Sequence, residues 1–281
     1  MRQPDPAGLR WRGRWPPPEG PRVALVGSRK PTPYGESVAE QLAAELAASG
    51  VIVISGLALG IDAAAHRGAL VGRGTTVAVM GTGVDIVYPA AHSRLAEEIV
   101  ASGGTLVSQF ADGTEPRRHN FPARNWTMAA LSDVVVVVEA AEGSGALITA
   151  QAALELGREV MAVPGSIFSP LSVGCHALLR DGAALVQNAR DVRAAVGLAQ
   201  EVLDDPLGPP TRAGFELARA RDGLVLHLSE ATSVSATELA RKVELPVAEV
   251  LGRLTSLELE GAVRRQAGGY VRALRRGGGR A

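Results

Sequence analysis

The chain has 281 residues, and 46% of them are hydrophobic, which is enough apolar material for one large domain and a smaller one. Its 29 basic and 29 acidic side chains leave a formal net charge of +0, so nucleic-acid binding would need a local basic patch. The single cysteine excludes an intramolecular disulfide and a cysteine-based zinc site, and no apolar run approaches the ~18 residues that span a membrane.

Short apolar runs alternate along the chain with amphipathic stretches. The runs predict strands over 23–26, 51–55, 75–80, 105–108, 134–138, 160–163 and 183–186. The amphipathic stretches predict helices over 35–48, 62–71, 93–101, 124–131, 147–156 and 175–179. Strands without polar–apolar alternation, separated by helices, are typical of a parallel sheet that is covered on both faces. We therefore expect an α/β domain with an extended Rossmann-like, doubly wound parallel sheet.

The domain boundaries follow from composition. Residues 1–21 are rich in Arg and Pro without an apolar signal core, so we expect an N-terminal arm and a cytoplasmic protein. The large domain is predicted over 22–196. Residues 197–213 contain Asp-Pro and Gly-Pro-Pro steps typical of a linker. A small domain is predicted over 214–274, and an Arg/Gly-rich tail over 275–281.

The small domain has the pattern of a winged helix. Ser235 and Glu238 form a capping-box pattern that opens one helix, and Pro246 fits the first turn of the next. Three leucines are expected to face inward from that second helix, namely Leu251, Leu254 and Leu257. Gly268-Gly269 between two short apolar runs predicts a hairpin. Winged helices bind DNA or protein, and the pattern leaves both open.

Glycine-rich turns follow several predicted strands, and these turns share the carboxyl edge of a parallel sheet. Gly27-Ser28-Arg29 follows the first strand, where amides and a guanidinium can hold a phosphate. Gly143-Ser144-Gly145 is a candidate phosphate loop, although it can equally serve only to pack a helix. No Gly-x-Gly-x-x-Gly follows a strand and no Walker pattern is present, which disfavours a nicotinamide enzyme and a P-loop ATPase.

Three arginines and two aromatic residues occur within 117–126 of this aromatic-poor chain. Positive charge together with stacking aromatics is what a single-stranded nucleic-acid groove requires. The alternative is that Phe121 packs as a hydrophobic staple before a helix while Arg117 and Arg118 are solvated.

Other titratable residues favour ordinary structural roles. Asp62 and His66 are four residues apart, but no third ligand has suitable spacing, so we expect Asp62 to cap a helix and His66 to make a buried hydrogen bond. Cys175 is expected to pack as a small hydrophobic residue, since its neighbour His176 faces elsewhere on a helix. The sequence predicts no catalytic residues, metal or cofactor.

Taken together, these residues resemble the DprA/Smf family of DNA-processing proteins, over about 23–195. The resemblance rests on an ordered series: Val26-Gly27-Ser28-Arg29, Ser55-Gly56-Leu57-Ala58-Leu59-Gly60-Ile61-Asp62, Gly81-x-Gly83 with Tyr88-Pro89, Phe121-Pro122-x-Arg124-Asn125, Glu139 with Ser144-Gly145-Ala146-Leu147-Ile148-Thr149-Ala150, Ala162-Val163-Pro164-Gly165, Gly174-Cys175 and Gly182-Ala183.

The resemblance implies a homodimeric, cytoplasmic protein that is not an enzyme. It implies binding of single-stranded DNA, which is protected and loaded with RecA during natural transformation, and contact with single-strand-binding protein. The implied DNA-binding residues are Gly27, Ser28, Arg29, Arg118, Phe121, Arg124 and Asn125. Trp126 stands where relatives usually carry Arg, and we expect the N-terminal SAM-like domain of many relatives to be lacking.

Two alternatives come from other classes of protein. The same superfamily includes nucleoside-monophosphate phosphoribohydrolases of the LOG type, but the acid of their Pro-Gly-Gly-x-Gly-Thr-x-x-Glu loop has no counterpart in Glu142-Gly143-Ser144-Gly145-Ala146-Leu147-Ile148-Thr149. Release of adenine from adenosine monophosphate would distinguish that enzyme. The other alternative is a nucleotide sensor that binds its ligand at Ser144 and controls a duplex-binding winged helix.

Overall fold

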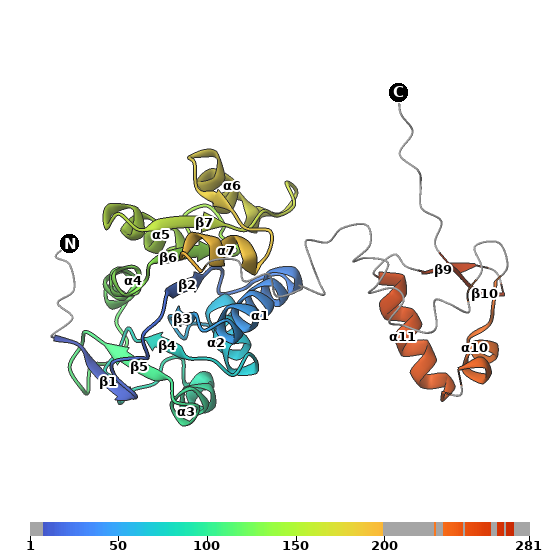
Figure 1. Cartoon of the computed structure of the whole chain (residues 1–281), viewed down its shortest axis with the longest axis horizontal. Coiled ribbons are helices and arrows are strands. Elements are labelled where there is room, and N and C mark those ends of the chain that lie inside the picture. The colour runs from blue at the N-terminus through green and yellow to red at the C-terminus, as the bar shows by residue number, and fades with distance from the viewer. Residues whose placement is uncertain are drawn as a thin grey trace. The chain divides into compact units, whose positions relative to one another are not determined.

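The computed structural model of the chain describes residues 8–198, 228, 233–243, 245–259, 263–266 and 268–272. It divides into two compact units, Met1–Glu201 and Val202–Ala281, which are described separately (Figure 1). The predicted linker and the predicted Arg/Gly-rich tail lie outside the described residues, apart from residues 197 and 198. Within the described part, no helix reaches the length and apolarity that crossing a bilayer requires.

The first unit is built on an eight-stranded sheet with the order β1-β5-β4-β3-β2-β6-β7-β8. The strands are β1 (Arg10–Gly13), β2 (Arg22–Val26), β3 (Ile52–Ser55), β4 (Thr76–Val79), β5 (Thr105–Ser108), β6 (Val134–Val137), β7 (Glu159–Ala162) and β8 (Ala184–Leu185). All seven predicted strands are present. They lie side by side in the order β5-β4-β3-β2-β6-β7-β8, and each neighbouring pair is parallel. The expected parallel α/β sheet is confirmed.

The strand order reverses at the centre of the sheet. From β2 the chain builds outward through β3, β4 and β5, then returns to place β6 on the other side of β2. Val23 pairs with Val134 and Val26 with Val137 across this junction. The connections after β2 and β6 therefore diverge to opposite sides, and such a switch point leaves a crevice at the carboxyl edge of the sheet.

Helices cover both faces of the sheet (Figure 1). They are α1 (Pro33–Ala48), α2 (Ile61–Val71), α3 (Ser93–Ala101), α4 (Asn120–Leu131), α5 (Gly145–Glu155), α6 (Val173–Arg180) and α7 (Ala189–Ala195). Val23 and Leu25 share one apolar cluster with residues of α1, α2 and α7, whereas Ala24 and Val26 share another with residues of α4, α5 and α6. Successive residues of a strand face opposite sides, so β2 is apolar throughout because both of its faces are buried.

One strand of the sheet was not predicted. β1 lies in the segment expected to be an arm, and it pairs antiparallel with β5, where Arg10 is opposite Ser108. Its sequence, Arg-Trp-Arg-Gly, alternates charge with one aromatic and resembles no buried strand. Such a sequence suits an edge strand, where charged side chains keep contact with water. The Trp11 ring also stacks on Trp15, with ring centroids 6.2 Å apart.

The second unit has the predicted order of two helices and a hairpin. These are α10 (Ala236–Lys242), α11 (Val247–Leu259), β9 (Val263–Gln266) and β10 (Gly269–Arg272). Ser235 caps α10, because its hydroxyl accepts a hydrogen bond from the Glu238 amide at 3.2 Å. One prediction is wrong: Leu251 is 41% exposed, and Val250 is buried in its place. Positions 250, 254 and 257 are spaced by four and three residues, so they lie on one face of the helix, which packs in the core. Position 251 lies outside this face.

Candidate nucleic-acid interface

The ten predicted site residues line one cavity of about 660 Å³ at the carboxyl edge of the sheet. They come from the connection after β2, from the segment that opens α4 and from the connection after β6. They are Gly27, Ser28, Arg29, Arg118, Phe121, Arg124, Asn125, Gly143, Ser144 and Gly145. The cavity therefore occupies the switch point between β2 and β6. We refer to it below as the groove.

The loop after β2 is fixed by backbone contacts that leave its basic side chains exposed. The Ser28 amide donates to the Glu139 carbonyl at 2.7 Å, and the Ser28 carbonyl accepts from the Ile61 amide at 3.1 Å. The Lys30 amide donates to the Ser28 hydroxyl at 3.1 Å, so that hydroxyl still has its own proton to donate. A side chain at Gly27 would come within 2.7 Å of Ile61, so glycine is required there.

Phe121 forms an aromatic wall of the groove. It is the second residue of α4, so it lies inside the helix and not before it, as a hydrophobic staple would. The Arg29 guanidinium lies 5.4 Å from the ring centroid, and the Tyr88 ring lies 5.7 Å from it. Gly81 makes this position possible, because a Cβ there would lie 2.8 Å from the ring. The half-buried ring is held in place and borders the groove.

The Arg124 guanidinium lies 6.0 Å from the centroid of the Phe121 ring, and the residue is only 3% exposed. Its Nη1 donates to the carbonyl oxygens of Val79, at 2.7 Å, and of Gly56. These bonds tie α4 to the ends of β3 and β4. The guanidinium donors thus serve protein carbonyls, and this geometry favours a positioning role for Arg124 over direct contact with a phosphate.

Asp62 is a buried acid that interacts electrostatically with Arg124. Burial raises the pKa of the Asp62 carboxyl, while the charge of Arg124 opposes that rise. Burial likewise lowers the pKa of Arg124, and Asp62 opposes the change. The prediction that Asp62 caps α2 is wrong, because the N-cap residue is Gly60 and no side chain caps that helix. Asp62 instead lies within the first turn, where its carboxylate accepts from the Ala58 amide at 3.3 Å.

The loop after β6 is joined to α4 through Asn125, whose amide nitrogen donates to the Gly145 carbonyl at 3.0 Å. Ser144 is the N-cap of α5, and its hydroxyl accepts from the Ala146 amide at 3.3 Å. Thr149 also lines the groove, and its buried hydroxyl has no hydrogen-bond partner in the part of the chain that the structure describes. The structure thus gives Ser144 a capping role while leaving the helix N-terminus beside the groove.

The charge of the groove comes from exposed arginines. Arg29 and Arg118 are both exposed, and neither forms an ion pair within the described residues. Glu142, an exposed acid, also lines the groove. Tyr88 also lines the groove, and it is not among the predicted site residues. In the sequence it belongs only to the Tyr88-Pro89 family motif, which could have identified it. The arrangement supplies two guanidinium groups, neither of them ion-paired among the described residues, next to a fixed aromatic ring.

The residues that could suggest catalysis have structural surroundings. Cys175 is buried in the core, and burial raises the pKa of its thiol to about 11, which disfavours a reactive thiolate. His176 Nε2 bonds the Gly165 carbonyl at 3.1 Å. The predicted buried hydrogen bond of His66 is confirmed, since its Nδ1 lies 2.8 Å from the Thr76 hydroxyl. In the part of the chain that the structure describes, no three acidic, His or Cys side chains group as a metal site requires.

The fold and the groove together define an α/β protein with a candidate polyanion site at a switch point and a winged-helix unit. Comparison with known proteins names the family. The model of the DNA recombination-mediator protein A family matches residues 2–197, and that of the DprA winged helix domain matches residues 208–269. The chain belongs to the DprA/Smf family of DNA-processing proteins, as its motifs predicted.

Individual relatives agree with this assignment. The DprA protein of Mycobacterium tuberculosis is 45% identical over 259 residues, which cover 92% of this chain and 66% of that protein. Protein Smf of Escherichia coli is 40% identical over 260 residues, covering 90% of this chain and 68% of that protein. The chain therefore spans about two thirds of the length of these relatives.

Two solved structures are also similar. DNA processing protein A of Streptococcus pneumoniae matches with a TM-score of 0.62 and 42% identity, covering 66% of this chain and 65% of the other. DNA processing protein A of Helicobacter pylori matches with a TM-score of 0.61 and 30% identity, covering 68% of this chain and 86% of the other. The description of the Helicobacter structure concerns the single-stranded DNA binding mode of that protein.

Proposed function

We propose that this protein is a recombination mediator that binds single-stranded DNA in the groove between β2 and β6 with little sequence preference. The observation that carries the proposal is the convergence of Arg29, Arg118 and Phe121 on one cavity. Free positive charge beside an aromatic ring neutralises a phosphate backbone and stacks a base, and every base has a face to stack. The single-stranded DNA binding described for the Helicobacter relative supports the same proposal.

Each residue has a distinct role in the proposed complex. Arg29 and Arg118 neutralise phosphates, and the Ser28 hydroxyl donates a hydrogen bond to the backbone. Phe121 stacks a base on the ring face that borders the groove. Arg124 and Asn125 hold the surrounding loops in register, since their hydrogen bonds join α4 to the ends of β3 and β4 and to the first residue of α5. The loop 143–145 offers further backbone donors at the opposite wall.

Membership of the family supports a proposal for the wider role. We propose that the cytoplasmic protein acts as a homodimer, protects incoming single strands, displaces single-strand-binding protein and loads RecA during natural transformation. Two grooves in a dimer would raise the apparent affinity for a long strand, because the second binding event is intramolecular. No chemical step is part of this role, and the proposed protein is not an enzyme.

The test is binding of a fluorescein-labelled dT oligomer, measured by fluorescence anisotropy with duplex DNA as competitor. Arg29→Ala and Phe121→Ala should each weaken binding, the latter by the ~1–3 kcal/mol that one stacked base contributes. Phe121→Tyr keeps the ring and should bind as the wild type does.

The matched control for charge is Arg158→Ala. Arg158 is an exposed arginine immediately before β7, at the opposite, amino edge of the sheet. Removal of that charge should leave dT binding unchanged. Equal losses for Arg29→Ala and Arg158→Ala would show that only general charge matters and would remove the groove from the proposal.

A further inference from the structure

The edge strand β1 and the residues after it carry basic and aromatic side chains outside the groove. Arg10 and Arg14 are exposed, and neither pairs with an acid among the residues that the structure describes. Trp11 is 51% exposed, although proteins bury most of the surface of an average tryptophan. Positive charge and an exposed aromatic ring thus occur together on one short segment. We refer to Arg10, Trp11, Arg14 and Trp15 as the β1 surface.

The Trp11 ring is held in place by an anchored neighbour. Trp15 packs against the apolar cluster that includes Val107 of β5 and Met128 of α4, so its ring is attached to the core. The Trp11 ring stacks on Trp15 with an angle of 28° between the ring planes. A ring fixed in this way loses little conformational entropy when a base stacks on its exposed side.

The first residue of β1 lies near the connection that leads into the groove. Arg10 is opposite Ser108, the last residue of β5, so it stands at the carboxyl edge of the sheet. The connection from β5 to α4 starts at that point and carries the exposed Arg117 and Arg118. At its far end, Arg118 and Phe121 line the groove. A strand that leaves the groove along this connection therefore reaches Arg10.

The groove and the β1 surface are two separate contacts. The connection between them also holds two exposed acids, Asp112 and Glu115, so the basic charge is interrupted. Four strand spacings separate β1 from β2 in the sheet order, which amounts to roughly 19 Å. A single strand that advances about 3.4 Å per stacked nucleotide covers this span in about six nucleotides. Once a strand is held in the groove, its binding to the β1 surface is intramolecular, which raises the apparent affinity.

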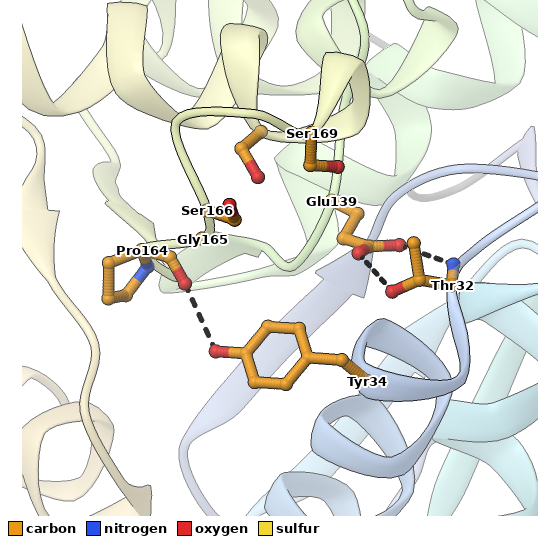
Figure 2. Close-up of a pocket in the computed structure, with 8 residues that line it drawn as sticks. Thr32, Tyr34, Glu139, Pro164, Gly165, Ser166 and Ser169 are labelled. Carbon is orange, nitrogen blue, oxygen red and sulfur yellow. Dashed lines mark hydrogen bonds between the residues drawn. The ribbon is translucent and has the colours of Figure 1, made fainter.

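The side of the groove away from β1 offers no comparable contact. A cavity of about 520 Å³ lies there between the start of α1 and the loop before α6, and none of the eight described residues that line it is basic (Figure 2). Both carboxylate oxygens of Glu139 already accept from Thr32, at 2.9 Å from its amide and 2.6 Å from its hydroxyl. The Tyr34 hydroxyl likewise donates to the Pro164 carbonyl at 3.0 Å. An acid without a basic neighbour in the lining repels a phosphate, so we expect the strand to turn towards β1.

We propose that the β1 surface is a second contact for the same single strand of DNA that the groove binds. Arg10 and Arg14 neutralise phosphates on either side of a base that stacks on Trp11. In extended chain the Cα atoms of the two arginines are separated by roughly 13 Å, the rise of about four stacked nucleotides. Neither charge nor stacking reads the identity of a base, so the contact keeps the low sequence preference of the groove. The inference rests on the proposed function and lengthens the stretch of strand that this chain contacts.

The experiment measures, by fluorescence anisotropy, the binding of two fluorescein-labelled oligomers, a dT tetramer and a dT 20-mer. A stacked tetramer advances only about 14 Å, too little to occupy the groove and reach β1. Trp11→Ala should weaken binding of the 20-mer about tenfold, within the range of one base–aromatic stack, and should leave tetramer binding unchanged. Trp11→Phe keeps a stacking ring and should bind the 20-mer nearly as the wild type does. Equal affinity of Trp11→Ala and the wild type for the 20-mer would overturn the inference.

Tyr34→Ala is the matched aromatic control, because Tyr34 is also 51% exposed but lies on the other side of the groove. It should bind the 20-mer as the wild type does. A loss of affinity in Tyr34→Ala without a loss in Trp11→Ala would place the strand on that other side and refute the inference.

The arginines provide a test that leaves the tryptophan stack intact, and it decides alone if Trp11→Ala proves unstable in urea unfolding. The double variant Arg10→Ala/Arg14→Ala should reduce the slope of the logarithm of 20-mer affinity against the logarithm of salt concentration by about 1.4, as expected for two phosphates. The slope for the tetramer should not change. Arg158→Ala, the charge control, should leave both slopes at the wild-type value. An unchanged 20-mer slope in the double variant would rule out phosphate contacts at β1.

Trp11 also reports contact directly through its fluorescence. The chain has three tryptophans, so Trp11 is the only one left in the variant Trp15→Phe/Trp126→Phe. The 20-mer should quench this fluorescence by stacking, and the tetramer should not. If poly-glutamate restores the fluorescence as effectively as an unlabelled 20-mer of equal charge, the β1 surface binds acidic chains in general and the inference fails. Arg29→Ala and Phe121→Ala should weaken binding of both oligomers, whereas variants at β1 weaken only the 20-mer, so failure of this inference and failure of the proposed function give different results.

Discussion

The stability of the first unit should fall at mildly acidic pH because of one buried histidine. The Thr76 hydroxyl donates its proton to the Val53 carbonyl at 2.8 Å, so it must accept from His66 Nδ1. His66 Nε2 is then unprotonated and buried, and it has no hydrogen-bond partner among the residues that the structure describes. A proton on Nε2 would place a charge inside the core, and burial accordingly lowers the pKa of His66 from 6.5 to about 3.

The sign and size of the effect follow from linkage. Below pH 6.5 the unfolded chain binds a proton at this histidine and the folded chain does not, until the pH approaches 3. Stability is therefore lost as the pH falls between these two values, by about 1.4 kcal/mol per unit. From pH 7.5 to pH 5, His66 alone should reduce the free energy of unfolding by about 2 kcal/mol.

Urea unfolding followed by tryptophan fluorescence measures this loss. All three tryptophans, at positions 11, 15 and 126, lie in the first unit, so the signal reports that unit. His66→Asn cannot titrate but retains an amide donor for Thr76. It should be less stable than the wild type at pH 7.5 and should lose about 2 kcal/mol less on acidification. His119→Asn, at an exposed histidine, should retain the wild-type pH dependence. Parallel pH profiles for His66→Asn and the wild type would refute the reasoning.

Three further predictions concern the groove. Gly81→Ala places a Cβ 2.8 Å from the Phe121 ring and should displace that ring. The affinity for dT oligomers, measured by anisotropy titration, should then fall by roughly 1 kcal/mol. An unchanged affinity would show that the position of the ring is unimportant. Arg124→Ala removes the charge that opposes the cost of burying Asp62, together with the bonds to the Gly56 and Val79 carbonyls, so it should cost about 3–5 kcal/mol in urea unfolding. Asp62→Asn in the same chain should restore part of that loss, and a loss below about 1 kcal/mol would contradict this account of Arg124. If Arg29 and Arg118 each neutralise one phosphate, the logarithm of the binding constant should fall with the logarithm of the salt concentration at a slope of about −1.4. In Arg29→Ala the slope should be about −0.7. A binding constant that does not change with salt would exclude phosphate contacts.

Several parts of the fold could be predicted because their signals are local. The strands of the sheet are short apolar runs whose lack of alternation shows burial on both faces, and the structure confirms each of them within about two residues. β1 and α7 were not predicted. β1 is a charged edge strand that depends on its partner β5, and α7 is only seven residues long, too short for a clear helical period.

The sequence also determined which residues stand at the ends of the strands, and hence which side chains were candidates for the site. Gly27, Arg29 and Phe121 were named from local chemistry and from the family motifs, and they do line one cavity. Composition and the order of motifs are properties of the sequence, so these candidates can be named without the tertiary structure.

Only the tertiary structure decided what each candidate faces. The sequence groups Arg124 with the neighbouring Arg117 and Arg118 as a candidate DNA-binding residue. In the structure, carbonyl oxygens at the ends of β3 and β4 accept its hydrogen bonds and Asp62 of α2 lies near it, so Arg124 is buried and positions α4. Likewise, the parallel pairing of β2 with β6 joins loops more than a hundred residues apart, and so creates both cavities. The spacing of motifs along the chain does not predict which distant loops meet, because the order of the strands is set by packing across the whole sheet.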